Sequence, residues 1–386
     1  MLYRNGYSIL GFGCMRLPMD YAACEKLILR AIEGGINYFD TAYVYFGKEA
    51  MLGKILANNR CRDQVMIATK LPSYLIRNRD NVVSIFDTEL KRLQTDYVDN
   101  YLMHMLPDLK VWNHLRELGI EEWLTQKKAS GQIRKVGFSF HGSTNAFLEL
   151  LSAYPWDFCQ IQYNYMDEHS QAGRTGLLAA HQKNIPVIIM EPLRGGTLTN
   201  GLPAEAKIVF RKTGESPASW GLRWLWAQNE VTCVLSGMNA LPMVDENIAT
   251  ASVQREFTRH DQDVINQAKA AINAKIRVLC TGCSYCMPCP HGVDIPGSFR
   301  CYNASYSDSY YKGLKDYLLS TTFKIKRSNA SLCVQCGLCE KKCPQRIPIR
   351  AELLNVKKRF ENPAYKTAAA FIRLILREKR SQKQEE

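Results

Sequence analysis

The sequence predicts an α/β protein in which a closed (β/α)8 barrel is followed by a small, mostly α-helical, cysteine-rich domain. Two observations support this fold class. Short apolar runs alternate with longer helical patterns eight times between residues 7 and about 252, and most of the fourteen cysteines fall between Cys280 and Cys343. Consecutive β/α units imply parallel strands that are all buried, and eight is the number that closes a barrel.

The elements of the barrel follow from this alternation. The expected strands are residues 8–13, 38–41, 65–70, 98–104, 136–140, 158–162, 187–191 and 233–237, and helical patterns cover 21–33, 49–57, 80–93, 120–130 and 144–153. A doubly wound sheet is the alternative, but no G-x-G-x-x-G turn follows the first strand. The expected domains are a barrel over 1–258, a helical connector over 259–276, the cysteine-rich domain over 277–350, and a C-terminal helix with a basic tail over 351–386.

The cysteines form two runs with regular spacing. The first run is C-x2-C-x2-C-x2-C-P and the second is C-x2-C-x2-C-x3-C-P. In the second spacing three sulfurs hold one iron–sulfur cubane and the fourth ligates a neighbouring cubane. We therefore expect two [4Fe–4S] clusters. Their expected ligands are Cys280, Cys283, Cys286 and Cys343 for one cluster, and Cys333, Cys336, Cys339 and Cys289 for the other.

Zinc and disulfides are the alternatives for these cysteines. Zinc sites use paired C-x2-C knuckles, and a third cysteine at the next step exceeds that need. The segment 290–332 between the runs is too long for the hairpins of compact bacterial ferredoxins, and residues 309–323 carry apolar residues at helical steps. Residues 277–350 thus resemble the α-helical ferredoxin domains of larger oxidoreductases, which implies an electron-transfer module.

Polar residues end three consecutive expected strands of the barrel. Asp40 follows the second strand, Lys70 ends the third, His104 ends the fourth, and Tyr45 lies in the loop after Asp40. Chemistry in (β/α)8 barrels is located at the carboxyl ends of the strands. Each residue alone has an ordinary structural explanation, such as a helix cap or a packing tyrosine. Together they predict an active site.

The segments around these residues carry a resemblance to a family. GINYFDTAYVYFG (35–47), VMIATK (65–70) and DNYLMH (99–104) resemble the aldo-keto reductases, and the resemblance covers about residues 8–250. It implies a TIM barrel that reduces a carbonyl or oxidises an alcohol with NAD(P)H, with Tyr45, Asp40, Lys70 and His104 as the catalytic residues. A phenol is a weak acid, with an ordinary pKa near 10. Lys70, paired with Asp40, would help Tyr45 to donate its proton, and His104 would orient the carbonyl.

The same resemblance implies a cofactor site. Ser139 and Gln160 correspond to the residues that bind the nicotinamide amide, while Phe140, followed by His141, replaces the family's asparagine after that serine. Met190 replaces an aromatic residue that stacks on the nicotinamide; a core methionine is the alternative. The remaining expected cofactor contacts are Gly195, with Gly196, near the pyrophosphate, Gly237 in the loop after the last strand, and Asn247 at the adenine. The lysine and arginine that bind the 2′-phosphate of NADP in the family are replaced by Gly237 and Met243, which weakens the case for NADP and leaves NAD, or no tightly held nucleotide, open.

Charge and composition restrict the partners. The formal charge is +13, and two oxidised clusters with their thiolates would lower it to about +9. Basic residues gather at Lys357–Arg359 and at 377–380, as a solvated helix face or as a docking surface for an acidic electron carrier such as a ferredoxin or flavodoxin. No nucleic-acid motif and no long apolar run is present in the sequence. Clustered thiols favour a reducing, cytoplasmic location.

Three functions are consistent with these features. The first is a nicotinamide-dependent reductase of a small carbonyl or alcohol substrate, with two clusters that transfer single electrons. The second is a redox-sensing or electron-transfer binding protein whose clusters are structural or sensory. The third is an enzyme that takes electrons from ferredoxin without a nicotinamide. Phe46, Met105, Trp112 and Leu193 are the apolar candidates for the substrate pocket.

Overall fold

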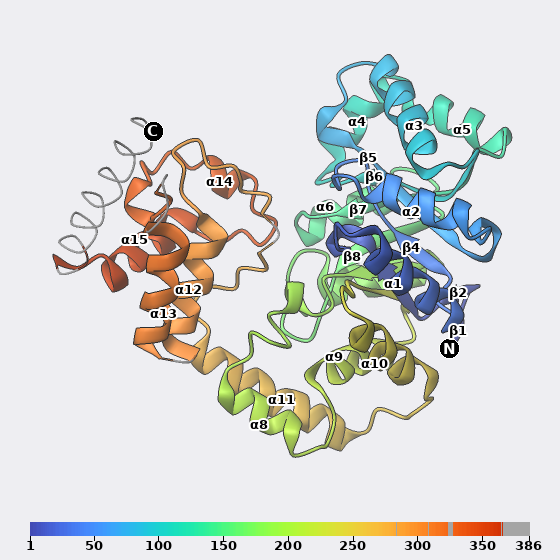
Figure 1. Cartoon of the computed structure of the whole chain (residues 1–386). Helices are drawn as coiled ribbons and strands as arrows, with labels where there is room; N and C mark the ends of the chain where they lie inside the picture. Colours follow the sequence, from blue (N-terminus) through green and yellow to red (C-terminus); the bar gives the residue numbers. More distant parts are fainter. Residues whose placement is uncertain (283, 308, 323–326, 364, 366–386) are drawn as a thin grey trace, which may run out of the picture. The chain divides into compact units, whose positions relative to one another are not determined.

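A computed structural model of the chain describes residues 1–282, 284–307, 309–322, 327–363 and 365. The chain divides into two compact units (Figure 1). The barrel unit comprises Met1–Arg194 and Glu215–Gln262, and the C-terminal unit comprises Gly195–Gly214 and Asp263–Glu386.

The barrel unit is built on eight parallel strands that close in the order β10-β3-β4-β5-β6-β7-β8-β9. They are β3 (Leu10–Gly13), β4 (Tyr38–Asp40), β5 (Met66–Pro72), β6 (Val98–His104), β7 (Ile133–Phe140), β8 (Phe158–Gln162), β9 (Val187–Met190) and β10 (Val231–Ser236). A short antiparallel hairpin, β1 (Tyr3–Arg4) and β2 (Tyr7–Ser8), precedes them. Side chains fill the barrel interior, among them Tyr7, Tyr38, Leu102 and Phe158. The barrel is therefore a packed core, and its chemistry has to lie at an end.

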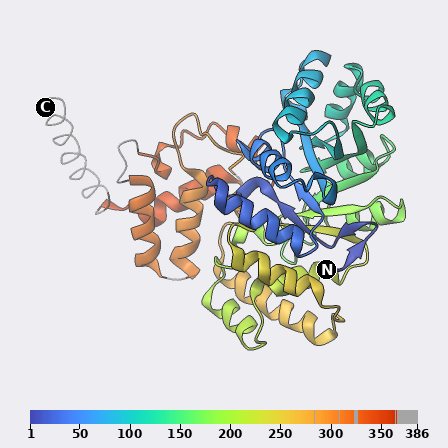
Figure 2. The same cartoon turned by 45° about the vertical axis from the view of Figure 1, so that its right-hand side comes forward.

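Helices surround the strands of this unit (Figure 2). They are α1 (Tyr21–Glu33), α2 (Lys48–Asn58), α3 (Arg79–Leu93), α4 (Leu109–Glu117), α5 (Ile120–Ala129), α6 (Thr144–Leu151), α7 (Gly173–Gln182), α9 (Pro217–Trp226) and α10 (Leu241–Ser252). Short 3-10 turns are η1 (Cys14–Arg16), η2 (Arg62–Gln64), η3 (Ser73–Leu75) and η4 (Arg194–Gly196). Polar side chains start several helices: Asp20 accepts the amide of Ala23 in α1, and Asn78 accepts that of Asn81 in α3. Such caps satisfy amides that have no partner within the helix.

The C-terminal unit is mostly helical. It contains α8 (Ala204–Arg211), most of α11 (Arg259–Lys275), α12 (Ile295–Ser307), α13 (Tyr310–Tyr317), the π turn η5 (Leu318–Thr322), the 3-10 turn η6 (Ala330–Leu332), α14 (Leu338–Lys341) and α15 (Ile349–Phe360). Lys275 at the end of α11 pairs with Glu205 of α8 at 3.0 Å. A separate apolar core, which includes Phe299, Tyr317, Val356 and Phe360, joins α12, α13 and α15.

The structure confirms the expected fold class. All eight expected strands form, and those at 98–104 and 158–162 have the predicted bounds. The helical pattern at 309–323 forms α13, which Ser309 caps, and continues as η5 to residue 322. The sequence did not single out α12, and residues 366–386 of the expected C-terminal helix and tail lie outside the described residues. Among the helices that the structure describes, none is long and apolar enough to cross a membrane.

Candidate active site and cysteine site

Lys70 is the centre of the polar group at the carboxyl end of the barrel strands. It lies on β5 between β4 and β6, the strands that end in Asp40 and His104. Its ammonium donates to Asp40 Oδ1 at 2.6 Å and to the Thr41 carbonyl at 2.6 Å. Both charged side chains are almost fully buried. Removing one partner of such a pair would leave the other charge without compensation in a low-dielectric site. Each side chain therefore depends on the other to remain buried and charged.

Tyr45 and His104 face this ammonium. Lys70 Nζ lies 5.1 Å from the centroid of the Tyr45 ring. The rings of Tyr45 and His104 meet edge to face, with their centroids 6.1 Å apart. Tyr45 is half-buried, whereas His104 is buried. The structure therefore brings together the four residues that the sequence singled out.

Burial decides the charge states in this group. It raises the pKa of Asp40, and the Lys70 ammonium opposes that shift. Burial and then the Lys70 charge hold the pKa of His104 well below its usual range. His104 is thus a neutral imidazole, and its buried Nδ1 has no hydrogen-bond partner within the described part of the chain. Unpaired buried polar atoms are rare, and this one is available to a ligand.

The loop that carries Tyr45 is anchored from behind by an arginine that sequence reasoning missed. Arg92 of α3 donates to the Tyr43 carbonyl at 3.1 Å, lies over the Tyr43 ring at 4.6 Å, and pairs with the buried Glu49 at 3.0 Å. Thr69, next to Lys70, donates to Glu49 at 2.6 Å. Contacts between residues so distant in sequence leave no local signal, so only the fold reveals this anchor.

The expected nicotinamide contacts lie side by side. Ser139 and Gln160 are register partners on β7 and β8, and both are buried. Gln160 Oε1 is buried and has no hydrogen-bond partner in the described residues, while Ser139 Oγ accepts the amide of Met105 at 2.9 Å. Met190 ends β9 opposite Gln162. A free buried carbonyl fits the amino group of a carboxamide, so these residues suit a nicotinamide.

Beside the nicotinamide positions, His141 differs from the family pattern. Its Nδ1 lies 3.1 Å from Gln171 Oε1, and burial lowers its pKa to about 4. Gln171 in turn donates to Gln162 at 2.6 Å, and Gln162 donates to Asp167 at 3.0 Å. Arg194 pairs with the same Asp167, and both are buried. His141 therefore belongs to a polar network behind the strand ends.

Two glycines, Gly13 and Gly237, border the rim next to β3 and β10. Gly13 ends β3 and Gly237 follows β10, the strand that pairs with β3, and a Cβ on Gly13 would lie 3.5 Å from the Ser236 carbonyl. The Arg16 side chain passes 3.9 Å from the Cβ position of Gly237. Arg16 therefore lies beside Gly237, one of the two positions at which the family carries a phosphate-binding cation. Sequence reasoning did not identify this arginine.

The other expected nucleotide contacts are a buried side chain and a glycine in a turn. Asn247 of α10 is buried and donates to Ser236 Oγ at 2.9 Å. Gly195 lies in η4 with φ 62°, in the left-handed region that favours glycine. Trp112, expected at the substrate pocket, is instead fully buried in an aromatic cluster with Tyr154 and Trp156. That expectation was wrong because α4 directs this side chain into the packing layer against α6.

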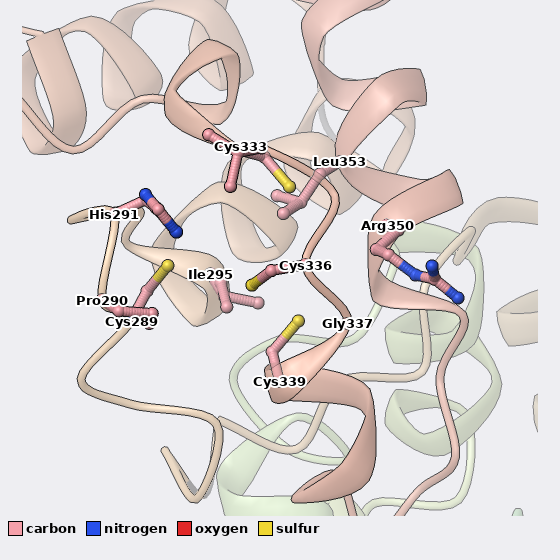
Figure 3. Close-up of a pocket in the computed structure, with 11 residues that line it drawn as sticks. Cys289, Pro290, His291, Ile295, Cys333, Cys336, Gly337, Cys339, Arg350 and Leu353 are labelled. Carbon is pink, nitrogen blue, oxygen red and sulfur yellow. The ribbon is translucent and has the colours of Figure 1, made fainter.

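In the C-terminal unit, four cysteines surround one hollow. Cys289 comes from the first run, and Cys333, Cys336 and Cys339 come from the second. Figure 3 shows their sulfurs around a shared space, with Ile295 and Leu353 forming apolar walls. The thiols do not converge on one point: among the described residues no three His, Cys, Asp or Glu side chains lie close enough to hold a single metal ion.

The two cysteine runs share a backbone pattern despite their different spacing. In the second run Gln335 (φ 62°) and Gly337 (φ 76°), which flank Cys336, are left-handed. In the first run Gly282 (φ 71°) and Ser284 (φ 65°) are left-handed at the equivalent positions. Such residues turn the chain so that successive cysteines can point to one side. The missing residue of the first run therefore changes only the part after Cys286.

The other expected ligands are only partly described. Cys280, Cys286 and Cys343 are half-buried and pack against the apolar core of the C-terminal unit. Cys283 lies outside the described residues. No disulfide joins two described cysteines.

Comparison with known proteins assigns both parts of the chain. The model of the aldo/keto reductase family matches residues 9–270, and the model of a 4Fe-4S dicluster domain matches residues 279–347. The NADP(+) aldo-keto reductase yakc of Schizosaccharomyces pombe is 24% identical over 64% of this chain and 84% of its own. The L-galactose dehydrogenase of Arabidopsis thaliana is 28% identical over 69% of this chain and 90% of its own.

Solved structures show the same fold. The holo form of an aldo-keto reductase from Bacillus halodurans has a TM-score of 0.57 at 24% identity, covering 67% of this chain and 91% of its own. An aldo/keto reductase of Klebsiella pneumoniae in complex with NADP and acetate has a TM-score of 0.57 at 22% identity, covering 68% and 91%. The chain therefore belongs to the aldo/keto reductase family, as an oxidoreductase of carbonyl or alcohol groups that carries a 4Fe-4S dicluster domain.

Proposed function

We propose that this protein reduces a small carbonyl, or oxidises the corresponding alcohol, with hydride from NAD(P)H, and that two [4Fe–4S] clusters exchange single electrons with a carrier. The observation that carries the proposal is the position of Lys70, which is fixed by Asp40 and faces the Tyr45 ring. We take residues 1–258 as the barrel domain, 259–276 as its connector, 277–350 as the cluster domain and 351–386 as a C-terminal helix and tail.

Tyr45 is the proposed proton donor. The Lys70 ammonium, 5.1 Å from its ring, stabilises the phenolate that remains when the hydroxyl gives its proton to the carbonyl oxygen. Asp40 and the Thr41 carbonyl hold that ammonium in place. The imidazole of His104 stays neutral. Its ring can therefore position the carbonyl without adding a second positive charge beside Lys70. In the oxidation direction the phenolate accepts the proton of the alcohol.

The nicotinamide, when bound, supplies or accepts the hydride at the carbonyl carbon. Gln160 and Ser139 would hold its amide, and Met190 would pack against the ring through its polarizable sulfur. Gly195 and Gly237 leave room for the nucleotide backbone, and Asn247 is the proposed contact at the adenine. The names of the S. pombe and K. pneumoniae proteins mention NADP. In this chain Arg16, beside Gly237, is the proposed cation for a nucleotide phosphate.

The cysteine geometry supports an iron–sulfur cluster over zinc. A zinc ion needs four sulfurs about 2.3 Å from a single point, whereas the four thiols of Figure 3 surround a hollow. We assign Cys289, Cys333, Cys336 and Cys339 to one cluster, and Cys280, Cys283, Cys286 and Cys343 to the second. Each cluster, when bound, supplies one electron at a time. Because thiolate-bound clusters need a reducing compartment, we propose a cytoplasmic location.

The test uses protein purified without oxygen. Iron and sulfide analysis should return about eight of each per chain. NADPH and NADH should each be titrated against the protein by fluorescence, and then oxidised in the presence of a panel of small aldehydes and ketones. Substrate-dependent oxidation of either nucleotide, together with full clusters, supports the proposal. Full clusters without nucleotide binding or carbonyl reduction would instead favour the redox-sensing protein or the ferredoxin-dependent enzyme.

A further inference from the structure

Helix α15 has two faces of different chemistry. Its buried face consists of Ile349, Leu353, Val356 and Phe360, which belong to the core of the C-terminal unit. On the other side Arg350, Leu354, Lys357 and Lys358 recur at helical steps and are exposed. Leu354 keeps 51% of its surface exposed. The exposed face is therefore apolar at its centre and basic towards both ends.

This face continues into the loop of the second cysteine run. The Arg350 amide and Nε donate to Glu340 at 2.8 and 2.9 Å, and Gln335 donates to the Arg350 carbonyl at 3.4 Å. The guanidinium lies against Gly337, on the outer side of the loop (Figure 3). These contacts place the loop directly beside the first turn of the helix, and Val334, Cys336 and Arg350 line the same hollow.

The loop adds apolar groups and a sulfur to this surface. Val334 is 57% exposed and Leu338 is 47% exposed. Cys336, which lies between them in sequence, is exposed. We call the combined patch the cluster-side surface; it consists of Val334, Cys336, Leu338, Arg350, Leu354, Lys357 and Lys358. Exposed apolar residues gathered in one place mark interaction sites.

The charge around this patch is mostly positive. Lys341, Lys342 and Arg346 follow the loop and are exposed. Glu340 is engaged with Arg350, and Glu352 is the acidic residue of α15 before its C-terminal cap. A basic rim around an apolar centre attracts an acidic partner and repels a second copy of the same surface.

We propose that the cluster-side surface docks a small acidic iron–sulfur electron carrier against the cluster held by Cys289, Cys333, Cys336 and Cys339. The inference rests on the proposed function, because it needs that cluster to be present. Because Cys336 is exposed, a carrier that docks here comes close to the redox centre. The lysines steer and orient the carrier, and Leu354 and Val334 supply the desolvated contact.

The experiment measures binding of an acidic 2[4Fe–4S] ferredoxin to the cluster-loaded chain by calorimetry, at low and at high ionic strength. The charge variant is Lys357→Glu/Lys358→Glu. Its matched control, Lys26→Glu/Lys91→Glu, makes the same charge change at exposed positions on α1 and α3. The apolar variant Leu354→Ser is matched by Leu178→Ser on α7, where the leucine is 36% exposed.

We expect the charge variant to raise Kd about tenfold or more at low ionic strength and much less at high ionic strength, because salt screens exposed charges. Leu354→Ser should raise Kd about threefold or more at both ionic strengths. The controls should change Kd less than about twofold. Iron content and the electron paramagnetic resonance of the reduced clusters should be the same in all variants.

Two results would overturn the docking surface alone. In the first, a fully loaded wild-type chain does not bind the ferredoxin, or binds it no better than the charge variant does. In the second, mixed-sequence duplex DNA binds this surface more tightly than the ferredoxin does. Iron and sulfide analysis that returns neither element would instead remove the proposed function, and the docking surface with it.

Discussion

The two sites of this protein are held together in different ways. In the barrel, polar groups fix one another: Lys70 is bound by Asp40 and Thr41, and the loop of Tyr45 is anchored by Arg92. In the C-terminal unit the cysteines stand around an open hollow on loops shaped by left-handed residues. The barrel site is therefore organised by the protein alone. The cysteine site is arranged for a ligand that has to complete it.

The largest expected effect is the response to iron removal. A chelator under anaerobic conditions should release the loops at 280–289 and 333–343, because ligand binding and folding are coupled in small metal-binding units. Amide hydrogen exchange should become fast in these loops and in α14. The strands β4, β5 and β6 should keep their protection.

Cys336→Ser tests by mutation whether the cysteine site, unlike the barrel, depends on its ligand. Cys301→Ala is the control, because Cys301 is a buried cysteine of α12 outside both runs. The serine variant should lose iron and show the same exchange pattern, while the alanine variant keeps its iron. Equal iron content in both variants would contradict the ligand assignment.

The next largest effect is expected at Tyr45. Tyr45→Phe removes the proposed proton donor and should lower kcat/KM for carbonyl reduction about 10³-fold. Nucleotide affinity and the visible absorbance of the clusters should not change. Tyr311→Phe, at an 80% exposed tyrosine of α13, controls for loss of a phenol. Activity within a factor of about three of wild type would exclude Tyr45 as the donor.

A smaller effect is expected at Arg92, which positions Tyr45 without touching the reacting atoms. Arg92→Met should lower kcat about fivefold with little change in KM, because it frees the Tyr43 backbone. It also leaves Glu49 buried without its cation, which should cost about 2 kcal/mol of unfolding free energy. Adding Glu49→Gln should recover much of that stability but not kcat. Recovery of both would mean that Arg92 acts only on stability.

The smallest effect on catalysis is expected from His141, whose contribution should appear only in the pH dependence of barrel stability. His141 has a folded-state pKa of about 4 against an ordinary 6.5, so the unfolded chain binds more protons between these values. The unfolding free energy should therefore fall as pH decreases from 6.5 towards 4, by about 1 to 3 kcal/mol for this residue. The variant His141→Asn, which can still bond Gln171, should show a shallower pH slope in urea unfolding of the barrel. An unchanged slope would show that His141 does not contribute.

Particular residues show how far sequence reasoning reached. Asp40, Lys70 and His104 could be found because parallel strands end at the same edge of a barrel, so equivalent strand ends in the sequence become neighbours in space. The grouping of Cys289 with Cys333, Cys336 and Cys339 could also be expected from the sequence. The spacing of the second run implies that its fourth cysteine binds the other cluster, so that a cysteine of the first run takes its place. Trp112 was misassigned because periodicity does not tell on which side of a helix a side chain meets its neighbours.

The sequence by itself determined the order of the barrel strands, the candidate catalytic side chains and the two cysteine runs, because these depend on local spacing along the chain. Only the tertiary structure decided that Arg92 anchors the loop of Tyr45, that Arg16 lies beside Gly237, and that α15 continues the loop of Cys336. These contacts join segments far apart in sequence. They depend on the closure of the barrel and on helix packing, which no local pattern encodes.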